Sequence, residues 1–335
     1  MKAYQVTGPG GIEALEFADR PTPVPGHGEV MVRVRAASLN YRDLAVVKGT
    51  YARGLKLPIV PLSDGAGEVT AVGPGVTRFK AGDRVAAIFM QTWIAGPPTD
   101  EYGKSALGGA IDGMLAEYVA LDQNGLVAIP PHLSFEEAAT LPCAAVTAWN
   151  ALFGQDRIKA GDTVLVMGSG GVSVFALQFA RIAGARVIAT SSSGAKLARL
   201  REMGASDGIN YVAIPEWDRR VRELTGGLGV DHVVEVGGSG TLARSLRAVR
   251  TGGRISLIGV LTGAGEIDPS PILRKSVAMQ GIYVGSRAAF EEMNRAIVTA
   301  AMRPVIDRVF PFEEAPAAYR HLASGAHFGK VVIRV

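Results

Sequence analysis

The sequence contains a single cysteine, Cys143, among its 335 residues. One cysteine excludes an intrachain disulfide and any metal site built from several thiolates. An excess of one charge sign is also missing, since 35 basic and 31 acidic residues give a net charge of +4, and like charges form no runs. A nucleic-acid-binding surface needs basic residues gathered on one face, so we expect no nucleic-acid partner.

Long apolar runs are absent too. None reaches the roughly 18 residues that suggest a membrane-spanning helix, and the N-terminal segment MKAYQVTGPGG lacks the apolar stretch of a secretion signal. We therefore expect a cytoplasmic protein that does not bind membranes. Hydrophobic residues make up 48% of the chain, enough for two cores, and a usual size of about 150 residues per domain predicts two domains.

The N-terminal third of the chain has the pattern of short β-strands. Between Gly28 and Asn40, Val30, Val32 and Val34 alternate with methionine and arginine, which is typical of a strand with one buried face. Frequent glycine and proline residues punctuate this region, as turns between strands require. A β domain is predicted here.

From residue 146 onwards, strand and helix patterns alternate. Short apolar runs, which are typical of parallel strands covered on both faces, occur at Thr163–Met167, Val187–Thr190, Asp231–Glu235 and Arg254–Gly259. Pro215 is predicted to lie in the first turn of a helix over Trp217–Leu224. This alternation predicts a right-handed, parallel α/β sheet.

The C-terminal residues return to the strand pattern. A helix is predicted near Ala289–Met302, and Lys330–Val335 (KVVIRV) is predicted to add an edge strand. We therefore expect an α/β domain over residues 146–284, inserted into a β domain made of residues 1–145 and 285–335.

A glycine-rich segment directly follows the predicted strand Thr163–Met167 and precedes an apolar helix. It consists of Gly168, Ser169, Gly170, Gly171, Val172 and Ser173. Gly168 allows a tight turn, Gly170 has no Cβ to block a pyrophosphate, and Ser173 is small enough for close helix–sheet packing. Free N–H groups and the dipole at a helix N-terminus bind phosphates. We interpret the segment as a dinucleotide-binding loop; the alternative is an ordinary glycine-rich turn.

The end of the following strand favours NADP(H) over NAD(H). An enzyme that prefers NAD places Asp or Glu there to bind the ribose hydroxyls. This chain instead has Ser191, Ser192, Ser193 and Lys196, and no carboxylate between residues 189 and 196. Hydroxyls can donate to a 2′-phosphate, and a lysine adds a compensating charge. The alternative interpretation is a polar loop with a solvated lysine.

Motifs along the whole chain carry a family resemblance. They are the glycine loop and the segments Ala36–Leu44, Pro61–Val76, Lys80–Val85, Asp112–Val119, Ala139–Leu152, Met203–Tyr211 and His327–Ile333. In these motifs the chain resembles the medium-chain dehydrogenases/reductases, specifically the zinc-free quinone oxidoreductase and zeta-crystallin branch. The resemblance implies a GroES-like β-barrel catalytic domain, a doubly wound Rossmann cofactor domain, a ligand cleft between them, and a homodimer.

The resemblance also bears on metal binding. Zinc-dependent relatives use a cysteine, a histidine and a second cysteine or acidic ligand, and the matching positions here are Asn40, Ser63 and Cys143. An amide, a hydroxyl and one thiol do not form the ligand set that zinc prefers. The five histidines show no ligand spacing. We therefore expect no metal, and we expect Cys143 to be a small buried residue.

Chemistry without zinc favours substrates that are already electrophilic. Hydride addition to a quinone or an α,β-unsaturated carbonyl gives a delocalised anion, whereas oxidation of a simple alcohol needs a stabilised alkoxide. The candidate catalytic residues implied by the resemblance are Asn40, as a donor to the substrate oxygen or the nicotinamide ribose, and Tyr41 or Tyr51, as a proton donor. A structural role for each, with water delivering the proton, is the alternative.

Further cofactor contacts are implied by the resemblance alone. Tyr211 and Lys196 would flank the 2′-phosphate, and two segments would contact the nicotinamide half. These segments consist of Gly259, Val260 and Leu261, and of Val284, Gly285, Ser286 and Arg287.

The sequence therefore predicts an NADPH-dependent reductase of quinones or enones. The alternatives are an NADP-dependent alcohol dehydrogenase or aldehyde reductase of the same fold, and an NADPH-binding protein without catalytic activity.

Overall fold

The structure, a computed structural model, describes residues 1–51, 55, 57–259 and 261–335. These residues fold into two units. Unit 1 contains Met1–Val146 and Gly285–Val335, and unit 2 contains Thr147–Val284. Val260 lies outside the described residues, so its predicted contact with the cofactor has no structural counterpart here. Among the described residues, no helix is both long enough and apolar enough to cross a lipid bilayer.

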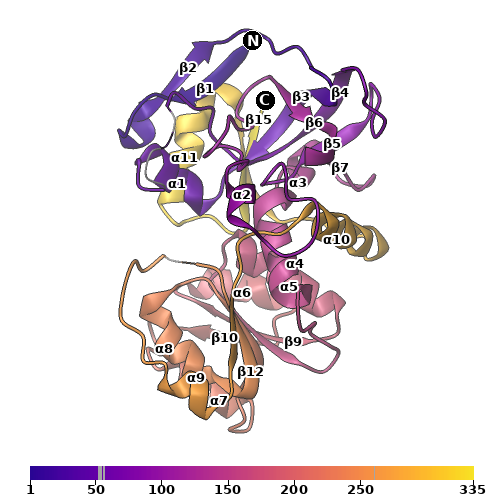
Figure 1. Cartoon of the computed structure of the whole chain (residues 1–335). Helices are drawn as coiled ribbons and strands as arrows, with labels where there is room; N and C mark the ends of the chain where they lie inside the picture. The colour runs from indigo at the N-terminus through magenta and orange to yellow at the C-terminus, as the bar shows by residue number, and fades with distance from the viewer. Residues whose placement is uncertain (52–54, 56, 260) are drawn as a thin grey trace. The chain divides into compact units, whose positions relative to one another are not determined.

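Unit 2 is built on a six-stranded sheet in which all neighbouring strands are parallel, as predicted (Figure 1). Its strands are β8 (Thr163–Met167), β9 (Arg186–Ser191), β10 (Asp207–Asn210), β11 (Val230–Glu235), β12 (Val249–Leu257) and β13 (Ala278–Gly281). Their order is β10-β9-β8-β11-β12-β13. The order reverses between β8 and β11, and the carboxyl ends of the strands at such a point are where open α/β sheets bind ligands.

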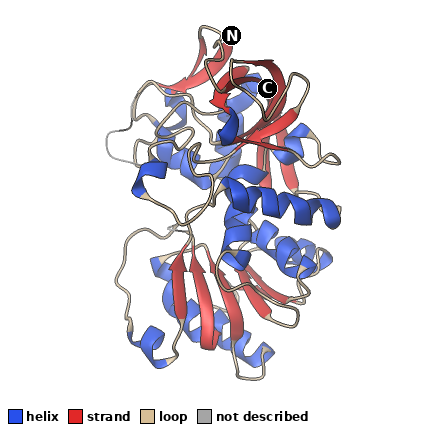
Figure 2. Cartoon of the chain, turned by 45° about the vertical axis from the view of Figure 1, so that its right-hand side comes forward, coloured by secondary structure: helices blue, strands red, loops and turns tan. Residues whose placement is uncertain are grey.

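Helices cover both faces of this sheet (Figure 2). They are α4 (Val146–Phe153), α5 (Gly171–Ile182), α6 (Gly194–Glu202), α7 (Trp217–Leu224), α8 (Ser239–Ala248) and α9 (Ser270–Arg274). Because both faces are covered, β8 is apolar along its length, and Val164, Leu165 and Val166 are fully buried.

Unit 1 is built mainly on antiparallel strands. They are β1 (Lys2–Val6), β2 (Leu15–Asp19), β3 (Glu29–Ser38), β4 (Asp64–Val72), β5 (Arg84–Ala87), β6 (Tyr118–Asp122), β7 (Leu126–Ala128), β14 (Ile306–Pro311) and β15 (Lys330–Arg334). The larger sheet has the order β14-β15-β3-β4-β5-β7, β6 also pairs with β3, and β1 pairs with β2. In β3 the alternating Val30, Val32 and Val34 are buried, as their spacing predicts.

The predicted edge strand at the C-terminus is in fact an interior strand. β15 lies between β14, to which it is parallel, and β3, to which it is antiparallel. Helices pack against this strand as well, and Lys330, Val331, Val332 and Ile333 are all buried. The last 51 residues, Gly285–Val335, thus fold back onto the N-terminal strands.

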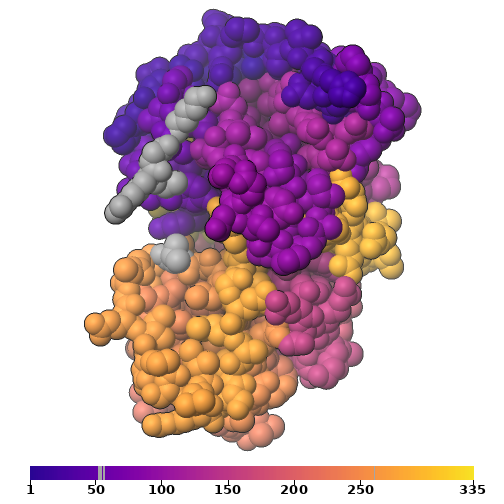
Figure 3. Space-filling model, viewed as in Figure 1, coloured from indigo at the N-terminus to yellow at the C-terminus, as the bar shows by residue number. Residues whose placement is uncertain are grey.

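The helices of unit 1 surround its sheet and carry part of its core. They are α1 (Tyr41–Val47), α2 (Asp100–Gly103), α3 (Phe135–Ala138), α10 (Arg287–Thr299) and α11 (Ala315–Ala323). The loop that carries α2 lies on the face of unit 1 turned to the viewer in Figures 1 and 3. Tyr319 of α11 is fully buried in the same core cluster as Leu39 and Leu44.

Two local predictions in unit 2 were wrong by a few residues. Pro215 precedes the N-cap Glu216 and so lies outside α7. The strand predicted over Arg254–Gly259 ends at Leu257, so Gly259 belongs to the loop that follows β12.

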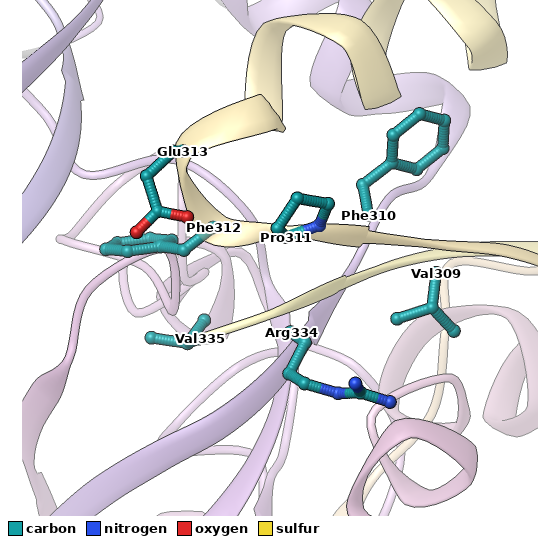
Figure 4. A pocket seen from close by; sticks show the side chains of 7 residues that line it. All are labelled: Val309, Phe310, Pro311, Phe312, Glu313, Arg334 and Val335. Carbon is teal, nitrogen blue, oxygen red and sulfur yellow. The ribbon is translucent and has the colours of Figure 1, made fainter.

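A shallow pocket of about 530 Å³ lies at the end of β14 and β15 (Figure 4). Its lining is apolar except for Glu313 and Arg334, and it includes none of the residues predicted to be functional.

The carboxylate of Glu235 fastens the loop after β11 to α8. This side chain is fully buried. Its Oε1 accepts hydrogen bonds from Gly237 N at 2.7 Å, Gly238 N at 3.1 Å and Thr241 Oγ1 at 2.6 Å. Its Oε2 accepts one from Ser245 Oγ. Only an acceptor with several lone pairs can serve four donors at once.

We expect Glu235→Gln to lower the free energy of unfolding by about 1–3 kcal/mol, because the new amide N–H must face a donor. Urea unfolding followed by circular dichroism measures the change. Glu223→Gln is the matched control, since its carboxylate is 63% exposed and pairs with Arg220 at the surface; its effect should stay within about 0.5 kcal/mol. Equal effects of the two substitutions would contradict this role of Glu235.

Candidate active site

The glycine loop connects β8 to α5 beside the reversal of strand order. Gly168 has a φ of +79°, a conformation that favours glycine, and its N–H donates to Thr190 O at 2.8 Å. A Cβ added at Gly168 or at Gly170 would meet no atom within 4 Å. The loop therefore has the tight turn and the open space that a diphosphate requires.

The N-terminus of α5 has no side-chain cap. Its N-cap is Gly170, and the first turn contains Gly171 and Val172. The Ser173 hydroxyl donates to Met167 O at 2.6 Å, which fastens the helix to the end of β8. The N–H groups of the first turn and the positive end of the helix dipole fit an anionic group. Ser169, in the loop itself, is buried.

The serine-rich segment lies at the carboxyl end of β9, next to β10. Ser191 is the last residue of β9, and its carbonyl accepts a hydrogen bond from Tyr211 N at 3.2 Å. Ser192 is exposed, and Ser193 is the N-cap of α6, where its hydroxyl accepts from Lys196 N at 3.4 Å. The Tyr211 ring is 42% exposed. The predicted residues thus lie together, and no carboxylate stands among residues 189–196.

The loop after β12 is tied to the end of β11. Gly259 N donates to Glu235 O at 3.2 Å. A Cβ at Gly259 would lie 1.6 Å from Val236 O, so this crossing excludes every residue except glycine. Leu261, two residues later, is 47% exposed. β12, β11 and β8 are parallel neighbours, so their carboxyl ends lie at the same edge of the sheet. Gly259, which follows β12, and the glycine loop, which follows β8, therefore lie at that edge.

The four residues predicted on the far side of the nicotinamide are divided between the two units. Val284 ends unit 2, has a φ of +57° that is unusual for a β-branched residue, and accepts a hydrogen bond from Asn150 Nδ2 at 2.7 Å. Gly285, Ser286 and Arg287 begin the second segment of unit 1. Ser286 is the N-cap of α10. The Arg287 guanidinium donates to Asn124 O and Oδ1 at 3.1 Å.

A buried polar cluster in unit 1 begins where β3 meets α1. Asn40 is the N-cap of α1, and its N–H donates to Asp43 Oδ2 at 2.7 Å. The Asp43 carboxyl is fully buried, and its Oδ1 lies 4.0 Å from Arg42 Nη1. Burial raises the pKa of the Asp43 carboxyl to about 6, against the lowering effect of Arg42.

Lys330, at the start of β15, brings a positive charge into this cluster. Its side chain is 3% exposed. Nζ donates to Leu39 O at 2.7 Å and to Asn40 Oδ1 at 2.5 Å, and lies 3.8 Å from Asp64 Oδ2. A buried ammonium group is tolerated when it is paired and hydrogen-bonded in this way.

Asp64 connects this lysine to the other two residues that match zinc-ligand positions. Its Oδ1 accepts from Ser63 Oγ at 2.8 Å, and its Oδ2 accepts from Cys143 N at 3.2 Å. Burial raises the pKa of the Asp64 carboxyl, and Lys330 opposes that rise. Burial and the nearby Asp64 charge raise the pKa of the Cys143 thiol to about 12, so the thiol is protonated at neutral pH.

This donor set does not fit a zinc ion. Zinc binds thiolate, imidazole or carboxylate groups, whereas the three matching positions offer an amide oxygen already bonded to Lys330, a hydroxyl that donates to Asp64, and a single thiol. In the part of the chain that the structure describes, no group of three or more His, Cys, Asp or Glu residues could hold a metal ion.

The backbone before Ser63 is strained. Leu62 has a φ of +69° although it is not a glycine, and it is fully buried. Its carbonyl accepts from Met114 N at 2.8 Å, and Cβ atoms at Gly108 or Gly113 would collide with its backbone. Strain of this kind clusters at functional sites, where packing holds a residue in a rare conformation.

The two candidate tyrosines differ in their surroundings. The Tyr51 ring lies on the Arg42 guanidinium, whose carbon is 4.3 Å from the ring centroid. Phe89 lies 4.5 Å from the same carbon, and Arg42 Nη1 donates to Leu107 O at 2.9 Å. Tyr51 thus lies in the environment of the polar cluster, whereas Tyr41 is 56% exposed.

Two residues of the cluster, Lys330 and Arg42, were not predicted as site residues. The available signal for Lys330 was its place at the start of an apolar strand, KVVI, and for Arg42 its place between Asn40 and Asp43. Neither pattern distinguishes a buried cation from a solvated one.

The raised pKa of Asp43 predicts a pH dependence of stability. A carboxyl that binds its proton more tightly in the folded state favours folding at low pH, and that contribution is lost as the pH rises through about 6. The free energy of unfolding of the wild type, relative to Asp43→Asn, should therefore fall by about 2 kcal/mol between roughly pH 4.5 and 7.5. Urea unfolding of both proteins across this range measures the difference. A difference that does not change with pH would contradict the assignment.

Two family models match the chain. The alcohol dehydrogenase GroES-like domain matches residues 26–131, and the zinc-binding dehydrogenase model matches residues 171–299. A zinc-type alcohol dehydrogenase-like protein of Schizosaccharomyces pombe is 47% identical over 92% of this chain and 91% of its own length. The quinone oxidoreductase of Rattus norvegicus is 29% identical over 99% of this chain and 97% of its own length.

Solved structures share the fold over the full chain. An NAD-dependent alcohol dehydrogenase has a TM-score of 0.91 at 37% identity, with all of both chains covered. A mycobacterial protein in complex with NADPH has a TM-score of 0.85 at 30% identity, again with both chains fully covered. These likenesses confirm the predicted combination of a GroES-like domain and a Rossmann sheet. The chain belongs to the medium-chain dehydrogenase/reductase superfamily and is an NAD(P)-dependent oxidoreductase.

Proposed function

We propose that this oxidoreductase uses NADPH to reduce quinones or α,β-unsaturated carbonyls and that it works without zinc. The donor set around Asn40 carries the proposal. Its amide oxygen is bonded to Lys330, the Ser63 hydroxyl donates to Asp64, and Cys143 supplies a single thiol. Such groups polarise a carbonyl more weakly than Zn²⁺ does, so a substrate that is electrophilic by itself is favoured.

Unit 2 would hold the cofactor. The loop from Gly168 to Gly170 and the first turn of α5 would bind the diphosphate, and Ser191–Ser193 with Lys196 would bind the 2′-phosphate. A reduced nicotinamide supplies a hydride when it is bound. The likeness to a structure in complex with NADPH supports NADPH as the cofactor. The chain is also similar to an NAD-dependent alcohol dehydrogenase, so the preference between NADPH and NADH has to be measured.

Unit 1 would act on the substrate oxygen. When the hydride adds to the quinone or to the β-carbon of an enone, the displaced electron pair moves to that oxygen. Asn40 Nδ2 would donate to the oxygen and stabilise its developing charge. Water, or the Tyr51 hydroxyl, would then deliver one proton. The net reaction consumes one NADPH and one proton and gives the two-electron-reduced product and NADP⁺.

The purified protein should oxidise NADPH in the presence of 1,2-naphthoquinone or a simple enone, measured as loss of NADPH absorbance. Simple primary alcohols with NADP⁺ should give no steady turnover, because no metal stabilises the alkoxide. Alcohol turnover together with inertness towards enones would assign the protein as an alcohol dehydrogenase. NADPH binding by calorimetry without turnover of any acceptor would assign a role without catalysis.

Lys196→Ala should raise the Kd of NADPH about 10- to 100-fold, since a hydrogen bond to a charged phosphate contributes roughly 1.5–3 kcal/mol. The Kd of NADH should change less than about twofold, because NADH lacks the 2′-phosphate. Fluorescence titration measures both constants. Lys159→Ala is the control, since Lys159 pairs with Asp162 before the opposite end of β8. An equal rise in the Kd of NADPH and of NADH in Lys196→Ala would contradict the binding of the 2′-phosphate by Lys196.

A further inference from the structure

An ammonium group fixes the orientation of the Asn40 amide. Lys330 Nζ can only donate hydrogen bonds, and it lies 2.5 Å from the Asn40 side-chain atom that faces it. That atom must therefore be the amide oxygen Oδ1, because an N–H there would face another donor. The amide nitrogen Nδ2 is consequently turned away from the lysine.

The backbone of Asn40 is held at the same time. Its N–H donates to Asp43 Oδ2 at 2.7 Å, and the carbonyl of the preceding residue, Leu39, accepts from Lys330 Nζ at 2.7 Å. Both ends of this short segment are thus hydrogen-bonded to side chains that are themselves buried. The amide can neither rotate nor flip without breaking the bond to the ammonium group.

Asn40 Nδ2 is a buried donor that lacks an acceptor. The atom is shielded from solvent and makes no hydrogen bond of good geometry to any described residue. A buried unpaired N–H costs about 1–3 kcal/mol, so its presence calls for a ligand acceptor. The Asp64 carboxylate is the competing acceptor, since the Asn40 amide is near enough to help lower its pKa.

We propose that Lys330 is a positioning residue for the reaction: it aims the Asn40 N–H at the substrate oxygen on which charge develops. This inference rests on the proposed function of Asn40 as the donor to that oxygen. The ammonium group also polarises the amide through the hydrogen bond to Oδ1, which makes the N–H a stronger donor. Lys330 need not touch the substrate, and an apolar residue of similar size, which has no N–H to donate, could not fix the amide.

The experiment compares Lys330→Met, Asn40→Ala and the double variant. Lys330→Met leaves the Asp64 carboxylate buried without its cation, so Lys330→Met combined with Asp64→Asn serves as a second form that removes both charges. Lys275→Met is the matched control. Lys275 is also partly buried and donates to backbone carbonyls, those of Leu246, Arg247 and Val249, but it bonds to no side chain among the described residues.

Lys330→Met should lower kcat roughly tenfold or more, as expected when a donor to a developing oxyanion is misaligned. KM and the Kd of NADPH should change less than about threefold, and adding Lys330→Met to Asn40→Ala should lower kcat no further. The variant lacking both charges should behave in the same way. Lys275→Met should lower the Tm and leave kcat unchanged. Independent, multiplicative losses from Asn40→Ala and Lys330→Met, or a Tm loss with normal kcat in Lys330→Met, would overturn the proposal.

A second readout does not require turnover. The Asn40 side-chain amide pair can be assigned in a ¹H–¹⁵N spectrum of the isotopically labelled protein by its loss in Asn40→Ala. Lys330→Met should shift or split this pair, and Lys275→Met should not. An unchanged pair in Lys330→Met would overturn the inference by itself. The two proposals can fail separately. If the wild-type protein reduced no acceptor while Lys330→Met still shifted the Asn40 amide signals, the proposed function would fail and the orientation of Asn40 by Lys330 would stand.

Discussion

A positive charge inside a protein must be surrounded by hydrogen-bond acceptors. In unit 1 this requirement determines how the side chains of the buried polar cluster are arranged. The ammonium group of Lys330 donates hydrogen bonds to the Leu39 carbonyl and the Asn40 amide oxygen, and it pairs with the Asp64 carboxylate. Asp64 is thereby paired with a side-chain cation, and it accepts hydrogen bonds from Ser63 Oγ and Cys143 N. The orientation of the Asn40 amide and the pairing of the buried Asp64 carboxylate both follow from this arrangement.

In the proposed function, unit 2 binds an anionic cofactor, and the diphosphate would contact mainly backbone groups. The reversal of strand order leaves space at the carboxyl ends of β8 and β11. Backbone N–H groups at the N-terminus of α5 would supply the donors, and Gly259 permits the close crossing over Val236. The buried Glu235 stabilises this edge from within, because its two oxygens accept from the loop and from α8. Geometry of the backbone, more than side-chain charge, prepares this edge for a diphosphate.

The local elements could be predicted because their signals lie within a few neighbouring residues. Thr163–Met167 is a strand with the predicted bounds, and α7 spans the predicted Trp217–Leu224. Non-local pairings were harder: Lys330–Val335 was assigned to an edge because nothing in KVVIRV reveals that β3, almost 300 residues earlier, pairs with it. For the same reason a lysine at a strand start gave no sign that it is buried beside Asn40. The residue types at the three positions that match zinc ligands, Asn40, Ser63 and Cys143, could be read from the sequence, but their hydrogen-bond partners could not.

The most direct test of the account is to measure zinc and reductase activity on the same preparation. Elemental analysis should find far less than one zinc per chain in protein that is fully active with NADPH and a quinone, and the activity of separate preparations should not vary with their residual zinc. Stoichiometric zinc in active protein, with activity that rises and falls in proportion to it, would contradict the account.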